Sequence, residues 1–219
     1  MPRLMFEKTG KAIWISHLDL MRVFQRAFKR AGLPLKHTQG FNPRPSVSIA
    51  LPLSVGVESK CELLDFDLEI ADITLCDIRD RLNEMLPVGV CVSDVYENGR
   101  KIRDLKLLSC RLSLEYDNGI PANTTSAIEE LFSRESLLVS KKTKSGILDQ
   151  DVIPMIRRLE VSEAGEKDVQ INALICCQNP TLNPAQLIAA ISGYIPEYAP
   201  NFCRYKRIEI YDEQEGIFR

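Results

Sequence analysis

SHLDLMRVFQRAFKRAGLPLKHTQGFNPRP, residues 16–45, joins a capped amphipathic helix to a loop rich in glycine, asparagine and proline. The Ser16 hydroxyl can accept a hydrogen bond from the first helical turn, and Asp19 places a carboxylate at the same turn. The helix is therefore expected to begin at His17. Gly32 suits the left-handed conformation that commonly ends a helix, so we expect the helix to end just before it.

Apolar and basic residues recur on different faces of this helix. The apolar residues follow intervals of three and four: Leu20, Phe24, Ala27, Phe28 and Ala31. The basic residues follow the same intervals: Arg22, Arg26, Lys29 and Arg30. This pattern predicts that one face enters a core. The other face is a basic stripe, which is either a solvated surface or a binding site for phosphates.

The loop that follows the helix, residues 36–45, is predicted to be neither helix nor regular strand. Pro43 and Pro45 restrict φ and remove N–H donors, whereas Gly40 permits a sharp bend. Asn42 can bond to the backbone of its own turn. The candidate nucleic-acid contacts in the loop are Lys36, Gln39, Phe41 and Arg44. The Phe41 ring could stack on a base, but we expect this lone aromatic residue to anchor the loop in the core.

Two histidines are the candidates for catalysis, although the sequence does not decide their role. His17 stands at a helix start, where it could act as a general base or contact a phosphate, and His37 lies in the loop. The alternative that we favour for His17 is a neutral imidazole below the helix N-terminus, bonded to loop backbone. We expect Asp19 to cap the helix rather than to join His17 and His37 in a cluster.

The elements around this stretch predict a first ferredoxin-like domain. Alternation and helical spacing predict strands at 3–8, with a possible extension over 12–15, and at 46–53, 62–70 and 90–96, and a helix at 74–85. The order is β-α-β-β-α-β. Gly56 and Glu58 fall in a predicted turn at 54–59. Glu58 would pair with a basic residue of the 40–45 loop if the two loops lie side by side.

The second half repeats this order of elements without visible sequence identity. We expect strands at 110–116, 137–140, 168–177 and 202–211, an irregular segment at 147–156, and helices that start at Thr124 or Thr125 and at 183–184. The predicted fold is α+β, with two ferredoxin-like halves and antiparallel sheets in a RAMP-like duplication. The predicted domains are 1–98 and 110–219, joined by a linker at 99–109.

Composition indicates an ordinary globular protein with an uneven charge distribution. The chain of 219 residues has a net charge of −2, yet its first 50 residues carry nine basic and only two acidic side chains. A local basic field can bind phosphates even on an acidic protein, because screening limits the reach of distant charges. A second basic group, Lys141, Lys142 and Lys144, is equally consistent with an exposed strand end.

Several classes of protein are disfavoured by the sequence. No run of 18 apolar residues is present, and the N-terminus lacks the apolar region of a signal peptide, so we expect a cytoplasmic protein without membrane association. Seven cysteines are scattered without metal-ligand spacing, which predicts reduced core thiols. We expect neither a bound metal nor a cofactor, and no independent catalytic activity.

Three blocks resemble the uncharacterised bacterial radical-SAM-linked proteins, which occur alone or fused behind a B12-binding radical-SAM module. The blocks are Ser16-His17-Leu18-Asp19 with Arg22, the run QGFNPRP at 39–45, and GVES at 56–59. The resemblance implies association with a radical-SAM protein. Because the chain contains no CxxxCxxC run, it would be the accessory component. The duplicated order of elements is also similar to RAMP-type endoribonucleases, an analogy of fold that makes RNA the first partner to test.

Three functions are consistent with these observations. The first is an RNA-binding accessory protein that presents a tRNA or rRNA through a basic groove to a radical-SAM partner. The second is a metal-independent RNA-processing or RNA-modifying enzyme that uses His17 and His37. The third is a protein–protein adaptor without nucleic acid, whose basic face meets an acidic patch on its partner.

Overall fold

The computed structural model describes residues 1–70, 72–143 and 146–219. The chain divides into two compact units: residues 1–102 with Arg219 form unit 1, and residues 103–218 form unit 2. The stretch 99–109, predicted as a linker, holds the short helix η2 (Ile102–Asp104) and the first residues of strand β5 (Leu107–Glu115). None of the helices in the described part of the chain combines the length and the apolar composition that crossing a bilayer requires.

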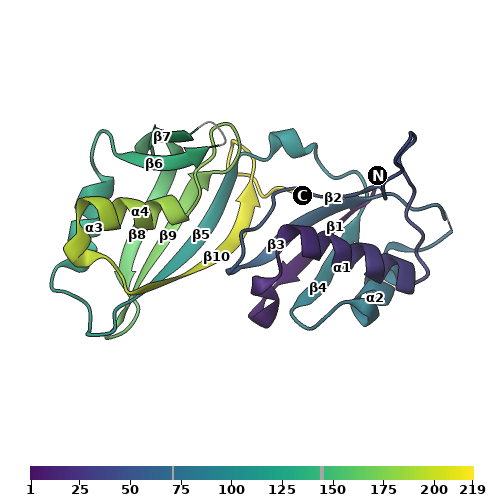
Figure 1. The fold of residues 1–219 in the computed structure, drawn as a ribbon, viewed down its shortest axis with the longest axis horizontal. Helices are drawn as coiled ribbons and strands as arrows, with labels where there is room; N and C mark the ends of the chain where they lie inside the picture. The colour runs from purple at the N-terminus through teal and green to yellow at the C-terminus, as the bar shows by residue number, and fades with distance from the viewer. Residues whose placement is uncertain (71, 144–145) are drawn as a thin grey trace. The chain divides into compact units, whose positions relative to one another are not determined.

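Unit 1 is an antiparallel sheet with two α-helices. Its elements are β1 (Arg3–Lys8), η1 (Gly10–Trp14), α1 (His17–Arg30), β2 (Val47–Ile49), β3 (Val57–Phe66), α2 (Leu75–Met85) and β4 (Val90–Tyr96). The strands lie in the order β4-β1-β3-β2, and each neighbouring pair is antiparallel. Figure 1 shows α1 and α2 on the same side of these strands. The prediction of the α+β class is therefore confirmed.

Three predicted strand boundaries in unit 1 are wrong. Residues 12–15 belong largely to η1 and do not extend β1. The strand predicted at 46–53 is limited to β2, which pairs only with the last residues of β3. The strand predicted at 62–70 begins earlier, at Val57, because β3 pairs with β1 as far back as Ser59 opposite Lys8. The GVES block is therefore the entry into β3 and not an open loop.

The apolar face of α1 forms the centre of the unit 1 core. Phe24 and Phe28 are fully buried, as are the two strand residues that they meet. The Phe24 ring lies 4.8 Å from Phe6 of β1, in an edge-on arrangement, and the Phe28 ring lies 5.0 Å from Phe66 of β3. Such aromatic pairs add to the stabilisation from buried area. These contacts fix α1 on the sheet and leave its basic face outward.

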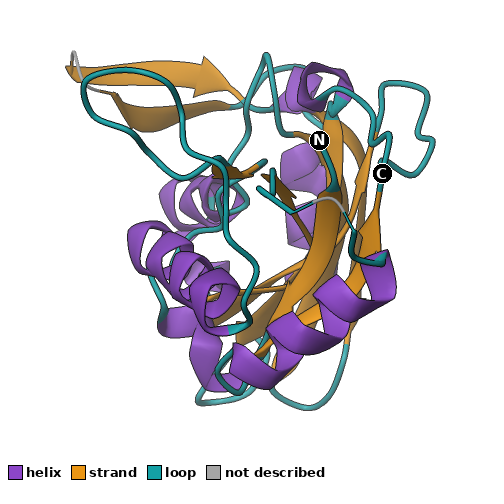
Figure 2. Ribbon diagram, turned by 90° about the vertical axis from the view of Figure 1, so that its right-hand side faces the viewer, coloured by secondary structure: helices purple, strands orange, loops and turns teal. Residues whose placement is uncertain are grey.

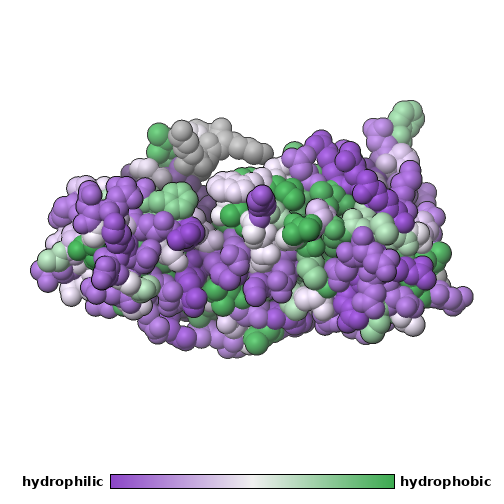
Figure 3. Space-filling model, turned by 90° about the horizontal axis from the view of Figure 1, so that it is seen from below, coloured by the Kyte–Doolittle hydropathy of each residue, from purple (hydrophilic) through white to green (hydrophobic). Residues whose placement is uncertain are grey.

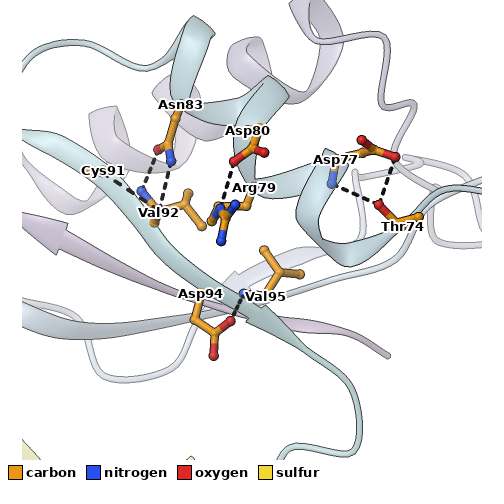
Figure 4. A network of polar contacts seen from close by, with 9 residues as sticks. All are labelled: Thr74, Asp77, Arg79, Asp80, Asn83, Cys91, Val92, Asp94 and Val95. Atoms are coloured by element: carbon orange, nitrogen blue, oxygen red, sulfur yellow. Dashed lines mark hydrogen bonds and ion pairs between the residues drawn. The ribbon is translucent and has the colours of Figure 1, made fainter.

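The α2 helix protects the outer edge of β4, which pairs with β1 on its other side (Figure 4). The Asn83 side chain donates to the Val92 carbonyl at 2.9 Å and accepts from the Val92 N–H at 2.7 Å. An unpaired strand edge would otherwise present these groups to other chains. Thr74 caps the same helix, since its hydroxyl accepts from the Asp77 N–H.

A partly buried ion pair joins β1 to β3. Arg3 and Asp65 stand opposite each other in the register. The guanidinium contacts both carboxylate oxygens, at 2.5 and 3.1 Å, and donates to the Arg100 carbonyl at 2.8 Å. The Arg3 side chain is 5% exposed. Because loss of one partner would leave an uncompensated buried charge, we expect this pair to stabilise unit 1.

In unit 2, the strands of the main sheet lie in the same order as in unit 1: the last strand along the chain, then the first, the third and the second. Its elements are β5, α3 (Thr124–Phe132), β6 (Leu138–Thr143), β7 (Gly146–Asp151), η3 (Ile153–Met155), β8 (Ile156–Glu163), β9 (Asp168–Cys176), α4 (Ala185–Tyr194), η4 (Pro196–Tyr198) and β10 (Phe202–Tyr211). The strand order is β10-β5-β9-β8, all antiparallel. Strands β6 and β7 form a separate hairpin, which extends away from the others in Figure 2.

The sequence analysis missed two strands of unit 2, β7 and β8. Residues 147–156, predicted as irregular, form most of β7 and η3. The ladder of β8 shifts register between Ile156 and Arg158 and is regular from Arg158 to Glu163, where Leu159 and Val161 are the apolar residues of the alternation. Thr124 is the first residue of α3 and not its cap, and its hydroxyl donates to the Pro121 carbonyl at 2.6 Å.

All seven cysteines are free thiols, but not all lie in the core. Cys61, Cys110, Cys176 and Cys177 are buried, whereas Cys76 and Cys91 are exposed and contradict the expectation of core thiols. Burial raises the pKa of Cys110 to about 12 and that of Cys177 to about 12. Because the thiolate is the reactive form, these two side chains are inert near neutral pH.

Candidate functional site

The first turn of α1 is held by a compact polar group. The Ser16 hydroxyl accepts from the Asp19 N–H at 3.2 Å and donates to the Asp19 carboxylate at 2.7 Å. Asp19 also forms an ion pair with Arg22 at 2.8 Å. The hydrogen bond from Ser16, followed by the contacts with Arg22, lowers the pKa of the Asp19 carboxyl. This group caps the helix and neutralises one member of the basic stripe.

The two histidines lie toward opposite ends of α1. His17 is half-buried at the helix start, and its side chain has no hydrogen-bond partner among the described residues. The expected bond from His17 to loop backbone is therefore absent from the described contacts. His37 lies beyond the helix end, and α1 with 14 residues is about 20 Å long. A cluster of His17, Asp19 and His37 does not form.

Residues 36–46 form a short antiparallel arm. The Ser46 N–H donates to the Lys36 carbonyl at 2.7 Å, and the Thr38 N–H donates to the Arg44 carbonyl at 2.8 Å. The Thr38 hydroxyl accepts from the Arg44 N–H at 3.0 Å. The arm is attached to the end of β3, because the Lys36 N–H donates to the Asp67 carbonyl and the Lys36 ammonium lies 3.2 Å from the Asp67 carboxylate.

The tip of the arm, residues 39–43, extends into solvent. Phe41 is fully exposed, with a relative accessibility of 105%. The expectation that Phe41 anchors the loop in the core is therefore wrong, because the paired arm carries the tip away from the core. Gly40 has a φ of +135°, and the Asn42 side chain has no hydrogen bond within the described chain. On the face that Figure 3 shows, which is the view from below relative to Figure 1, hydrophilic residues predominate and groups of apolar residues interrupt them.

A groove of about 570 Å³ lies between the second half of α1 and the base of the arm. It is lined by Gln25, Arg26, Phe28, Lys29, Gly32, Leu33, Pro34, Leu35, His37, Pro45 and Glu69. The floor is apolar, since Phe28, Leu33 and Leu35 are buried. Of the predicted site residues, the structure brings Arg26, Lys29, His37 and Pro45 together here. Arg22, Arg30, Lys36, Gln39, Phe41 and Arg44 lie outside the lining.

Ion pairing separates the predicted basic residues into two groups. Arg22 and Lys36 are paired with Asp19 and Asp67. The others have no acidic partner in the described part of the chain and are exposed: Arg26, Lys29, Arg30 and Arg44. A cation that forms no ion pair attracts an anion more strongly than one that already contacts a carboxylate. We call these four residues the unpaired cations. Arg26 and Lys29 line the groove, whereas Arg30 lies at the end of α1 and Arg44 in the arm.

The GVES block does not contribute to the groove. Gly56 has a φ of +83°, and a Cβ at this position would lie 3.3 Å from the Trp14 ring. Glycine therefore allows the backbone to lie close to the indole. Glu58 lies near the start of β3, whereas the arm is attached just beyond its other end, roughly 30 Å away along an extended strand. Arg44, the basic residue of the 40–45 loop, has no acidic partner in the described part of the chain, so the predicted pairing with Glu58 does not form there.

Glu69 is a groove residue that sequence reasoning missed. The alternation at 62–70 predicts that Glu69 faces solvent together with Asp65 and Asp67. Its backbone N–H donates to the Pro34 carbonyl at 2.9 Å, next to a bridge between Leu35 and Leu68. No local signal indicates this contact, because the paired segments are more than thirty residues apart.

The second basic group of the sequence, Lys141, Lys142 and Lys144, is not part of the candidate site. Lys144 lies outside the described residues. The Lys141 ammonium donates to the Thr181 carbonyl at 3.3 Å, which ties the β6 strand to a neighbouring loop of unit 2.

Together, the fold and the site define an α+β protein with two antiparallel sheet units and, in the first unit, an apolar groove bordered by unpaired cations. The chain belongs to the family of uncharacterised proteins conserved in bacteria that is designated DUF2344, whose model matches residues 2–184.

Solved structures give similarity of fold alone. A chain in the crystal structure of a Cbf5-Nop10-Gar1 complex aligns with a TM-score of 0.50 and 9% identity. The alignment covers 97% of this chain and 50% of that chain, so this chain spans about half the length of its structural neighbour. An unknown protein from Galdieria sulphuraria aligns over 94% of this chain and 96% of that one, with 12% identity and a TM-score of 0.26. No curated protein matches the sequence.

Proposed function

We propose that this protein binds a single-stranded region of RNA, such as a tRNA or an rRNA, through the outer face of α1 and the arm at 36–46. The observation that carries the proposal is the set of unpaired cations on α1 and the arm, two of which, Arg26 and Lys29, line a groove with an apolar floor. Cationic side chains that neutralise phosphates supply most of the non-specific affinity for nucleic acids. Arg22 and Lys36 contribute less, because carboxylates already neutralise them.

A single strand suits this site better than a duplex. The exposed Phe41 ring stands at the tip of an arm whose base lines the groove. Unstacked bases of single-stranded RNA stack on such aromatic rings, whereas the bases of a duplex are not available for stacking. An acidic protein partner would be attracted by the same cations but would not require an exposed aromatic ring beside them.

The proposal includes two elements from the sequence. The three motif blocks support an accessory role beside a radical-SAM protein, to which this chain would present the RNA. We also infer that both units are ferredoxin-like halves of a RAMP-like duplication, because each has a strand order of last, first, third and second. A catalytic role for the histidines is less well supported, since only His37 lines the groove.

The salt dependence of RNA binding tests the proposal. If four cations each contact one phosphate, log K should fall with log[salt] with a slope of about −3, so that affinity drops about 50-fold between 50 and 200 mM salt. Filter binding of a labelled single-stranded RNA measures both values. A protein that binds no RNA at the lower salt concentration would refute the proposed function and leave the protein–protein adaptor.

Replacing Phe41 by alanine tests the stacking contact. Loss of one base–aromatic stack costs about 1–3 kcal/mol, so binding should weaken by about 5- to 150-fold, with the salt dependence retained. The melting temperature should not change, because the side chain is fully exposed. Phe41→Tyr is the matched control and should keep the affinity. Unchanged binding by Phe41→Ala would exclude stacking at the arm.

A further inference from the structure

Glu69 is the one acid in the lining of the groove as far as the structure describes it, and it lies among cationic neighbours. The lining includes the cations Arg26 and Lys29, yet Glu69 forms no ion pair with either in the described chain. Its position is fixed by the backbone, through the hydrogen bond from its N–H to the Pro34 carbonyl. The Glu69 carboxylate is exposed and remains available as a hydrogen-bond acceptor.

This lining fits a ligand that combines three chemical features. Arg26 and Lys29 attract an anion, whereas the Glu69 carboxylate repels one and accepts from a donor. The floor of Phe28 and Leu33 favours an apolar surface. A chain of phosphates alone would not suit the carboxylate. A nucleotide has all three features: a flat base, an exocyclic amino donor on some bases, and a phosphate. The volume of about 570 Å³ lies in the range of small-molecule sites.

We infer that the groove is a nucleobase pocket, which selects an unstacked base with an exocyclic amino group. This inference rests on the proposed RNA binding and adds to it a preference between bases. Glu69 accepts from the amino group, as carboxylates do with N4 of cytosine. Arg26 and Lys29 contact the flanking phosphates, and the base covers the apolar floor. Uracil presents the O4 oxygen where cytosine presents its amino group, and the carboxylate repels that oxygen.

Binding of oligo(C) and oligo(U) of equal length tests the pocket, because both have the same backbone and ring size. We expect the wild-type protein to bind oligo(C) roughly tenfold more tightly. In Glu69→Gln the preference should fall below about threefold, because an amide offers both a donor and an acceptor. Glu84→Gln, which removes an exposed acid of α2, is the matched control and should keep the preference.

The outcomes distinguish the pocket from the proposed function. Salt-sensitive binding of both oligonucleotides without a preference would overturn the pocket and leave RNA binding intact. A preference that persists in Glu69→Gln would likewise overturn it, because another group would then read the base. If neither oligonucleotide binds at low salt, the proposed function fails and the pocket fails with it. A preference lost in Glu69→Gln and kept in Glu84→Gln would support the pocket.

Discussion

Replacement of Arg26 and Lys29 by glutamate is expected to weaken RNA binding by more than about 100-fold at intermediate salt. Both residues border the groove and are unpaired cations. A hydrogen bond to a charged group contributes about 1.5–3 kcal/mol, and each 1.4 kcal/mol corresponds to a factor of ten. In the variant, the slope of log K against log[salt] should also be less steep by about 1.4, which corresponds to two lost phosphate contacts. Filter binding over a range of salt concentrations measures both effects.

Two controls show whether this loss depends on the position of the charges. Arg81→Glu/Arg157→Glu changes the net charge by the same amount on two exposed side chains outside the groove, and it should weaken binding by only a few-fold. Arg22→Ala removes a cation that Asp19 already neutralises, so its effect should also be small. Equal losses in all variants would indicate a general charge effect and would refute a defined phosphate site on α1.

Replacement of Asp65 by alanine is expected to lower the free energy of unfolding by about 3 kcal/mol. The Arg3 guanidinium would lose both of its contacts with the carboxylate while remaining in a site where its side chain is 5% exposed. Loss of one partner of a buried ion pair costs about 3–5 kcal/mol, and the partial exposure of Asp65 places this pair at the lower end. Urea unfolding followed by circular dichroism measures the change.

A double variant separates the cost of an isolated charge from the value of the pair. Arg3→Met/Asp65→Leu replaces both groups by apolar side chains, and it should recover most of the stability that Asp65→Ala loses. If Asp65→Ala unfolds at the same urea concentration as the wild-type protein, the pair does not contribute to the stability of the protein. If the double variant is as unstable as Asp65→Ala, the pair itself contributes more than its desolvation costs.

Local patterns predicted much of the secondary structure. The strands at 3–8, 90–96 and 202–211 have the predicted bounds, and α1 begins at His17 as its cap predicts. These elements depend on neighbours within a few residues: an alternation of side chains, a capping serine, or apolar residues at helical spacing. The signal is weak in the missed strand β8, because only Leu159 and Val161 are apolar in its regular part.

The site was predictable only in part. Its basic residues on α1 could be predicted from the helical spacing, but the sequence did not show which basic residues form ion pairs. Arg22 is neutralised by a residue three positions away, whereas Lys36 is neutralised by Asp67, thirty-one positions away. Whether a cation remains available for a phosphate therefore depends on a contact across the sheet.

By itself, the sequence determined the position of α1, its buried and basic faces, and the α+β class, because these depend on short-range periodicity and capping. The tertiary structure alone decided that Phe41 is exposed, that Glu69 lines the groove, and that His17 and His37 are separated. The reason is physical. The groove forms only when α1, the arm and the end of β3 come together, and those contacts join residues that are distant in the chain.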